Sequence, residues 1–324
     1  MSPLPTLSAD QIEDIYSTTF SQKMPEIVDN TYNSNPVIAT LNAEGRILLD
    51  GGRRIEQGFI YGKLPGGSYL RGDTWTNARV NTKSSFIVDW KLHRAEIVID
   101  GMDDLQNAGA AAAFNSADLK TQEAELTLKD NLGSEIFGNG ADNGGAALNG
   151  FEEWVDDGTN FATIGGVTRG TDNVGTAAKG TYDATGGSWT IPVLQSPYGT
   201  STIENESPNL VATTQTLWNA LANRVQPQQR FPTGQGFDAL ARIGFRTLEY
   251  MRAAVVQDSH VQSGRAYGLN TRWIKLIVHS SRNGVLRGWI QNSIKDERAN
   301  HLLWAGNLIV PGPRFCFQQR GLVA

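Results

Sequence analysis

Asp258, Ser259 and His260 are consecutive residues with the side chains of a hydrolase active site. A catalytic triad also needs a serine on a sharp turn and an oxyanion-binding loop, and no GxSxG pattern supplies them. The four histidines of the chain are scattered, without the HExxH spacing that places two imidazoles on one helical face for zinc. We therefore expect no catalytic residue, no metal and no cofactor. A soluble hydrolase that uses Asp258 or His260 is the least favoured alternative.

Two other stretches have the spacing of ligand-binding loops but lack the residues that bind. Gly170 to Gly175 matches the glycines of a phosphate loop, yet Thr176 and Ala177 occupy the positions of its lysine and its serine or threonine. The sequence Asp156-Asp157-Gly158 looks like part of a calcium loop, but the alternating acidic ligands and the terminal glutamate are missing. We interpret this stretch as a turn.

Composition favours a folded protein with extended segments. The chain has 324 residues, 40% of them hydrophobic, which is enough for a sizeable core and about two domains. Thirty-five glycines and only 19% charged residues indicate many turns and long extended segments. A net charge of -5 argues against binding nucleic acid over a wide basic face. Cys316, between two phenylalanines, is the single cysteine and indicates a buried thiol in a reducing compartment.

One long helix is predicted from Ser116 to Gly138, and the rest of the chain is organised around it. Ser116 suits the N-cap, and Gly138 suits the left-handed residue that ends a helix. Leucine and isoleucine recur every fourth residue at 128, 132 and 136, so one face of this helix is predicted to be buried. Glu123 lies off this stripe and is predicted to be exposed.

A long two-stranded hairpin is predicted before this helix. Its strands are predicted over Ile55 to Tyr61 and Ser84 to Trp90, and its tip is polar and glycine-rich. Because a hairpin this long buries little surface of its own, it needs a partner surface to be stable. Tyr69 and Trp75 near the tip are the large aromatic residues that typically anchor interfaces.

The remaining segments predict a mixed α and β chain. A short helix is expected to end before Gly45, a strand to cover Arg94 to Asp100, and a surface loop to cover Gly165 to Gly187. Further helices are expected over Leu148 to Val155, Thr213 to Val225 and Gly244 to Val256, and irregular or edge strands over Leu308 to Phe317.

In their order, these stretches resemble the major capsid proteins of tailed bacteriophages, whose Johnson fold also forms encapsulin shells. The resemblance covers the chain from about residue 30 to residue 309. It is carried by the glycine-tipped hairpin before one long helix and by four segments: TYNSNPVIATLNAEGRILLDGGRRI, WKLHRAEIVIDGMDDLQNAG, ALNGFEEWVDDGTNFATIGGVTRG, and AYGLNTRWIKLIVHSSRN with LLWAGNLI.

The resemblance implies an α+β fold with four parts. These are an N-terminal arm over residues 1–50, an extended hairpin called the E-loop over 51–92, a peripheral domain with the long spine helix over 93–147, and an axial domain over 148–270. The chain is expected to return to the peripheral domain within 270–324. The run from Gly165 to Gly187 is a candidate for the axial rim at the centre of each capsomer.

The same resemblance implies a shell-forming function. Hexamers and pentamers of the chain would close an icosahedral head that encloses double-stranded phage DNA without sequence-specific binding. The sequence begins directly at the arm, so we expect a separate scaffolding protein, together with a portal, and the resemblance leaves a decoration protein open. We expect assembly in the bacterial cytoplasm, the virion capsid as the final location, and no membrane span.

The intersubunit contacts are expected on the E-loop, where relatives place it across the adjacent subunit. The alternative from the same fold is the shell of an encapsulin-type nanocompartment that holds a cargo enzyme. The predicted interface residues are Arg53, Arg54, Lys63, Tyr69, Arg71, Asp73 and Trp75.

Overall fold

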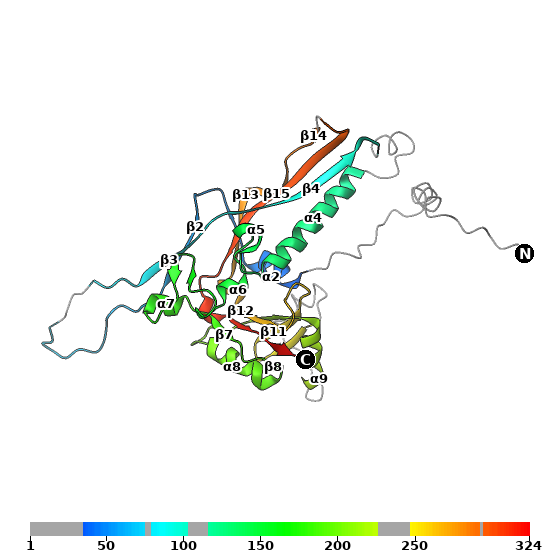
Figure 1. The fold of residues 1–324 in the computed structure, drawn as a ribbon. Coiled ribbons are helices and arrows are strands. Elements are labelled where there is room, and N and C mark those ends of the chain that lie inside the picture. Colours follow the sequence, from blue (N-terminus) through cyan, green and yellow to red (C-terminus); the bar gives the residue numbers. More distant parts are fainter. Residues whose placement is uncertain (1–34, 75–78, 103–115, 226–246, 292–293) are drawn as a thin grey trace, which may run out of the picture. The chain divides into compact units, whose positions relative to one another are not determined.

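The computed structural model of the chain describes residues 35–74, 79–102, 116–225, 247–291 and 294–324 (Figure 1). Residues 1–34 of the predicted arm and the interface candidate Trp75 lie outside these ranges. The chain divides into two compact units. The first contains Met1–Asn33, His93–Asp130 and Gly284–Leu303, and the second contains Ser34–Leu92, Asn131–Asn283 and Trp304–Ala324.

The described part of the first unit consists of one helix and pieces of one sheet. Strand β4 (Lys91–Asp100) pairs with β15 (Glu297–Ile309), which also pairs antiparallel with the short strand β14 (Ile290–Gln291). Alternate residues of β4, including Ile97 and Ile99, are buried, as a strand with one solvated face requires. The predicted strand from Arg94 to Asp100 is therefore confirmed.

The long helix α4 (Ser116–Glu135) begins at the predicted residue and is followed by a turn through Gly138. Its buried positions include Ala124 and Leu128, and Ile136 in the following turn is buried too. Leu132, however, is only half-buried, and Gly138 is not left-handed. The left-handed glycine comes two residues later, at Gly140 (φ 74°), so the chain leaves the helix through a longer turn than predicted.

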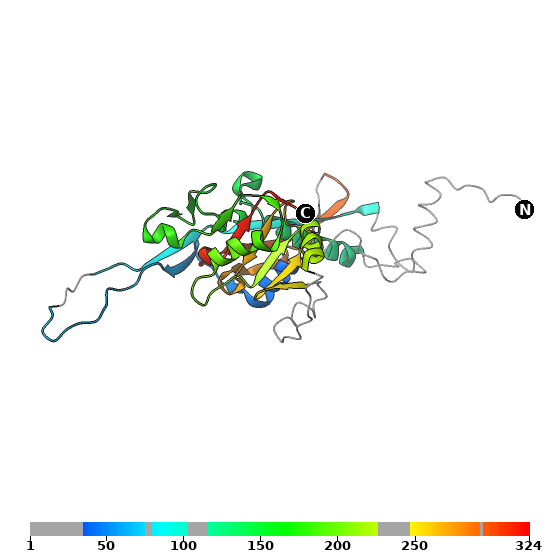
Figure 2. The same ribbon diagram turned by 90° about the horizontal axis from the view of Figure 1, so that it is seen from below.

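The second unit is built around a six-stranded sheet in the order β10-β11-β9-β12-β16-β7. Leu210 and Ala212 of β9 face one hydrophobic cluster, whereas Val211 between them faces the other. Both faces of the sheet are therefore covered, and in Figure 2 helices α8 and α9 lie in front of it. The strands of this sheet are β7 (Thr181–Asp183), β9 (Leu210–Thr213), β10 (Thr247–Tyr250), β11 (Ala253–Gln257), β12 (Ala266–Leu269) and β16 (Phe317–Gln319).

The other elements of this unit surround the sheet. The helices are α2 (Pro36–Glu44), α5 (Asp142–Gly145), α6 (Phe151–Trp154), α7 (Asn173–Ala177), α8 (Ile191–Ser201), α9 (Gln215–Val225), η3 (Thr271–Trp273) and η4 (Pro313–Phe315). The strands are β1 (Arg46–Leu49), β2 (Ile55–Ile60), β3 (Lys83–Val88), β5 (Thr163–Ile164), β6 (Val167–Thr168), β8 (Gly187–Ser188) and β17 (Leu322–Val323). Strand β13 (Lys275–Leu286) begins in this unit, where it pairs in parallel with β1.

The predicted helix from Gly244 to Val256 is wrong over its described residues, which form the β10–β11 hairpin. Met251, with φ 55°, lies in the turn between the two strands. Because both faces of β11 are buried, its run AAVV is continuously apolar and gives no strand-like alternation. The prediction of irregular or edge strands over Leu308 to Phe317 is confirmed for the stretch with the two prolines, which lies between β15 and β16. It is wrong for the two ends, because β15 and β16 both lie inside sheets and not at an edge.

The segment from Gly165 to Gly187 is not the surface loop that its polar composition predicts. It contains β6, α7 and β7, and its Arg169 is buried. The Arg169 guanidinium donates to four backbone carbonyls: Nε to Ala178 O (3.0 Å), Nη1 to Phe161 O (2.8 Å), and Nη2 to Glu153 O (2.7 Å) and Trp154 O (2.8 Å). Burial lowers the pKa of Arg169 to about 10, against the opposing effect of nearby Asp156.

The turn predicted at residues 156–158 is confirmed. Asp156 is fully buried, and its Oδ2 accepts hydrogen bonds from the backbone amides of Gly158, Asn160 and Phe161 at 2.9 to 3.2 Å. Its Oδ1 accepts from the Asn160 side chain at 2.8 Å. The carboxylate therefore holds a loop closed, as short polar side chains commonly do in turns.

Candidate intersubunit interface

The E-loop begins as a two-stranded ribbon, and its strands lie within one or two residues of the predicted limits. Strands β2 and β3 pair antiparallel from Ile55 opposite Val88 to Ile60 opposite Lys83. Phe86 is fully buried, stacks on Phe59 with ring centroids 4.3 Å apart, and meets Trp154 edge-on at 5.4 Å. Because Phe86 and Trp154 belong to one hydrophobic core, the base of the ribbon is anchored to the second unit.

Beyond the ribbon, the described part of the E-loop continues as a long loop (Figures 1 and 2), and several of its apolar side chains are exposed to solvent. Leu64, Tyr69 and Leu70 are 72%, 67% and 76% exposed. A tight turn fixes part of the tip, because Asp73 Oδ2 accepts from Leu70 N (2.6 Å) while Asp73 N donates to Leu70 O (3.1 Å). The tip is therefore a partly preformed apolar surface, which lowers the entropy lost when it binds.

The structure brings together some of the predicted interface residues and separates others. Tyr69, Arg71 and Asp73 lie within one turn, all exposed. Arg53 and Arg54 lie instead at the base, where Arg54 Nε pairs with Asp89 at 2.9 Å. The described predicted residues are Arg53, Arg54, Lys63, Tyr69, Arg71 and Asp73. Sequence reasoning overlooked Leu64 and Leu70, although leucines in a polar, glycine-rich stretch are a usable signal of an interface.

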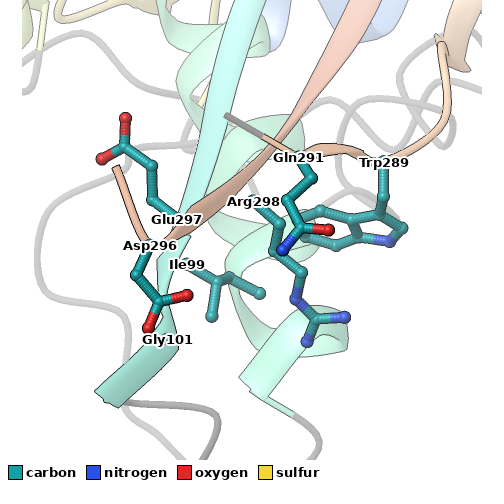
Figure 3. A pocket seen from close by; sticks show the side chains of 7 residues that line it. All are labelled: Ile99, Gly101, Trp289, Gln291, Asp296, Glu297 and Arg298. Carbon is teal, nitrogen blue, oxygen red and sulfur yellow. The ribbon is translucent and has the colours of Figure 1, made fainter. Parts of the chain in front are cut away.

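A second group of exposed apolar side chains lies in the first unit, on the chain between β13 and β15. Trp289, Ile290 and Ile294 are exposed there, Ile294 by 90%. Figure 3 shows Trp289 at the edge of a groove of about 260 Å³, where the Arg298 guanidinium lies 4.7 Å from its ring centroid. The sequence predicted no interface here, because this stretch was interpreted only as part of a mixed α and β region.

The residues Asp258, Ser259 and His260 do meet, but without the geometry of a catalytic triad. Asp258 Oδ1 lies 3.1 Å from His260 Nδ1, and Ser259 Oγ lies 3.5 Å from the same ring nitrogen. In a triad the carboxylate and the serine contact opposite nitrogens of the imidazole. Asp258 Oδ1 also accepts from His260 N at 3.0 Å, and Asn35 Nδ2 approaches His260 Nδ1 at 3.4 Å. The cluster therefore stabilises the chain where β11 ends.

Within the residues that the structure describes, no three histidine, cysteine, aspartate or glutamate side chains gather as metal ligands. None of the helices in the same ranges has both the length and the apolar character needed to cross a bilayer.

Comparison with known proteins finds similarity in structure alone. Neither models of protein families nor curated protein sequences match the chain. A solved cyanophage A-1(L) capsid chain has a TM-score of 0.71 at 14% identity, with 94% of this chain and 97% of that chain covered. A capsid chain of a native GTA particle has a TM-score of 0.64 at 9% identity, covering 93% and 95%.

A third match is the SrpI encapsulin of Synechococcus elongatus, with a TM-score of 0.56 and 8% identity over 98% of this chain and 96% of that chain. All three similarities extend over nearly the whole of both chains. The α+β chain described here therefore has the Johnson fold of tailed-phage major capsid proteins, which the sequence resemblance predicted.

Proposed function

We propose that this chain is a major capsid protein, which assembles as hexamers and pentamers into the icosahedral head shell around double-stranded phage DNA. The observation that carries the proposal is the capsid fold together with an E-loop whose apolar tip has no core of its own. Fully burying a leucine side chain is worth about 1.5 to 3 kcal/mol. A few such residues on each copy are enough, because every subunit of a shell repeats the same contacts.

Two separate contact surfaces suit a closed lattice better than one. The exposed apolar side chains of the E-loop lie in the second unit, and those around Trp289 and Ile294 lie in the first. We assign the E-loop residues Lys63, Tyr69, Arg71 and Asp73, with Leu64 and Leu70, to one intersubunit contact. We assign the stretch around Trp289 to another, made with a further copy of the chain.

The domain limits follow from the same proposal. We take residues 1–50 as the N-terminal arm, 51–92 as the E-loop, 93–147 as the peripheral domain with its spine helix, and 148–270 as the axial domain. A net charge of -5 suits a wall that encloses DNA without gripping it. A scaffolding protein and a portal are the partners that such a shell requires, assembly would take place in the bacterial cytoplasm, and the finished shell would be part of the virion.

The chain would act without catalysis, and the arrangement of Asp258 and His260 supports this. The alternative of an encapsulin-type compartment rests on the match to the SrpI shell. Particle contents separate the two: a phage head holds DNA, whereas a compartment holds a cargo protein. Nuclease-protected DNA in purified particles would support the head, and a stoichiometric second protein without DNA would support the compartment.

The E-loop assignment can be tested by replacing residues 65–77 with a short Gly-Ser linker. We expect a subunit with unchanged circular dichroism that sediments as monomers or small capsomers, because the loop adds nothing to the subunit core. A point variant sharpens this test: Leu70→Asp should block assembly, whereas Gly67→Asp adds the same charge nearby without removing an apolar side chain. Closed shells in normal yield from Leu70→Asp would refute the assignment, and loss of folding would show that the loop belongs to the subunit core.

A further inference from the structure

A short hairpin of the second unit lies against the base of the E-loop. Its strands β5 and β6 pair antiparallel, with Ile164 opposite Val167. Gly165 and Gly166 form the two-residue turn between them, with φ of 53° and 80°. Positive φ at both central positions is the geometry of a type I′ turn, which glycine adopts without strain. We call residues 163–168 the β5–β6 hairpin.

The turn of this hairpin contacts strand β3 of the E-loop. Ile87 N donates to Gly165 O at 2.9 Å, which joins the backbone of β3 to the turn. A Cβ atom built on Gly165 would lie 3.1 Å from Phe86 Cβ and 3.3 Å from Ile87 N, so a larger residue would displace β3. At Gly166, by contrast, no atom of the described residues lies within 4 Å of such a Cβ atom. Gly165 therefore makes the contact, and Gly166 completes the turn.

Two buried charged side chains hold the base of the β5–β6 hairpin. Arg169 N donates to Ala162 O at 2.8 Å, and Arg169 Nη1 donates to Phe161 O at 2.8 Å. Asp156 Oδ2 accepts from Phe161 N at 3.0 Å, so Phe161 is bound through both its amide and its carbonyl. None of these bonds involves the E-loop. They therefore fix the hairpin to the second unit independently of the E-loop.

The other strand of the E-loop ribbon is held at the same level. Gln57 of β2 lies opposite Phe86, and its Oε1 accepts from Lys275 Nζ at 3.3 Å. The ribbon is thus bound on both of its strands, at Gln57 and at Ile87. The tip lies farther out along the E-loop (Figure 1). A small change in the direction of the ribbon at this level therefore moves the apolar tip by a larger distance.

We propose that the β5–β6 hairpin is a clamp that sets the direction of the E-loop, and that Gly165 is the positioning residue of this clamp. The apolar packing of Phe86 is non-directional, whereas a hydrogen bond prefers a nearly straight N–H···O angle. The bond from Ile87 to Gly165 therefore restricts rotation of the ribbon about its base. The meaning of the clamp for assembly rests on the proposed shell function, because a preset direction lowers the entropy lost when the E-loop reaches a neighbour.

The first measurement is hydrogen exchange of single backbone amides in unassembled subunits. We expect Gly165→Ala to lower the protection of Ile87 N about fivefold, which corresponds to the loss of one typical intramolecular hydrogen bond. Gly166→Ala is the matched control, because its alanine also takes a positive φ but meets no described atom of β3. It should leave the protection of Ile87 N unchanged. The amide of Arg169 reports whether the hairpin stays folded in each variant.

The second measurement is the distance between a spin label on the ribbon and one on α8, attached at Lys83→Cys and Ser196→Cys, which are both exposed positions. We expect a narrow distribution of distances in this background and a clearly broader one after Gly165→Ala. Ile87→Pro removes the donor from β3 without altering the hairpin, and proline is tolerated in an edge strand. It should broaden the distribution as well.

Unchanged protection of Ile87 N in a folded Gly165→Ala variant would overturn the clamp. A similar loss in Gly166→Ala would also overturn it, because strain in the turn would then be the cause. If Gly165→Ala unfolds the hairpin, as lost protection at Arg169 N would show, Ile87→Pro decides: a narrow distribution of distances in that variant would refute the clamp. Since every measurement uses unassembled subunits, failure of the clamp is distinguishable from failure of the proposed shell function.

Discussion

Replacing Gly133 with alanine should destabilise the subunit, although the same substitution normally stabilises a helix. In a helix interior, Gly→Ala is favourable by about 1 kcal/mol. At Gly133 of α4, however, a Cβ atom would lie 2.7 Å from Asn35 Nδ2 and 3.2 Å from two atoms of the His260 ring. His260 cannot easily give way, because its ring and its backbone amide are both held by Asp258. The added methyl group must therefore displace Asn35.

Asn35 caps helix α2, since its Oδ1 accepts from Ile38 N at 2.9 Å. Losing such a cap costs about 1 kcal/mol, and inserting a methyl group into a filled space costs about 1 to 3 kcal/mol. Against the gain of about 1 kcal/mol in helix propensity, we expect a net destabilisation of about 1 to 3 kcal/mol. Urea unfolding of the unassembled subunit, followed by circular dichroism, measures this difference.

Gly199 of α8 is the matched control, because nothing lies within 4 Å of a Cβ atom built there. Gly199→Ala should stabilise the subunit by about 0.5 to 1 kcal/mol from helix propensity alone. The two substitutions are chemically identical and should shift the unfolding midpoint in opposite directions. A shift to higher urea in both variants would refute the close packing of α4 against Asn35 and His260.

Three further predictions concern buried groups. Phe86 is fully buried, so Phe86→Ala should destabilise the subunit by about 3 to 5 kcal/mol. Ile87 lies on the opposite face of the strand and is 39% exposed, so Ile87→Ala should cost under about 1 kcal/mol. Similar unfolding midpoints for the two variants would contradict this assignment of the faces. Arg169→Met leaves four backbone carbonyls without their donor and should destabilise the subunit by about 3 kcal/mol or more, measured by thermal unfolding. Arg272→Met is the control: its side chain is 70% exposed, so the unfolding temperature should hardly change. Cys316 is fully buried, and burial raises the pKa of its thiol to about 12. A thiol-specific reagent at pH 8 should therefore label Cys316 only after unfolding. Rapid labelling of folded subunits would contradict this prediction.

The E-loop ribbon and the start of α4 could be predicted because their signals are local. Ile55 to Ile60 and Lys83 to Val88 each contain β-branched and aromatic residues, and a hairpin pairs strands that are near in sequence. Ser116 precedes a periodic segment, so the helix start is visible in the sequence. These features need no knowledge of the tertiary contacts.

The features that the sequence did not predict depend on contacts between residues that are distant in sequence. The β11 run is apolar throughout because clusters from other elements cover both of its faces, so its period is hidden. Arg169 belongs to a polar stretch, but its donors reach carbonyls at residues 153, 154, 161 and 178, which composition cannot reveal. Similarly, the exposure of Leu70 and Trp289 is a property of the folded chain.

Cryo-electron microscopy of the assemblies recovered from a lysate that contains this chain shows whether it builds shells. We expect closed polyhedral shells whose class averages resolve rings of five and six subunits, with the E-loop of each subunit lying on a neighbour. A chain recovered only as monomers or small globular oligomers at every concentration, with no such rings, would contradict this expectation.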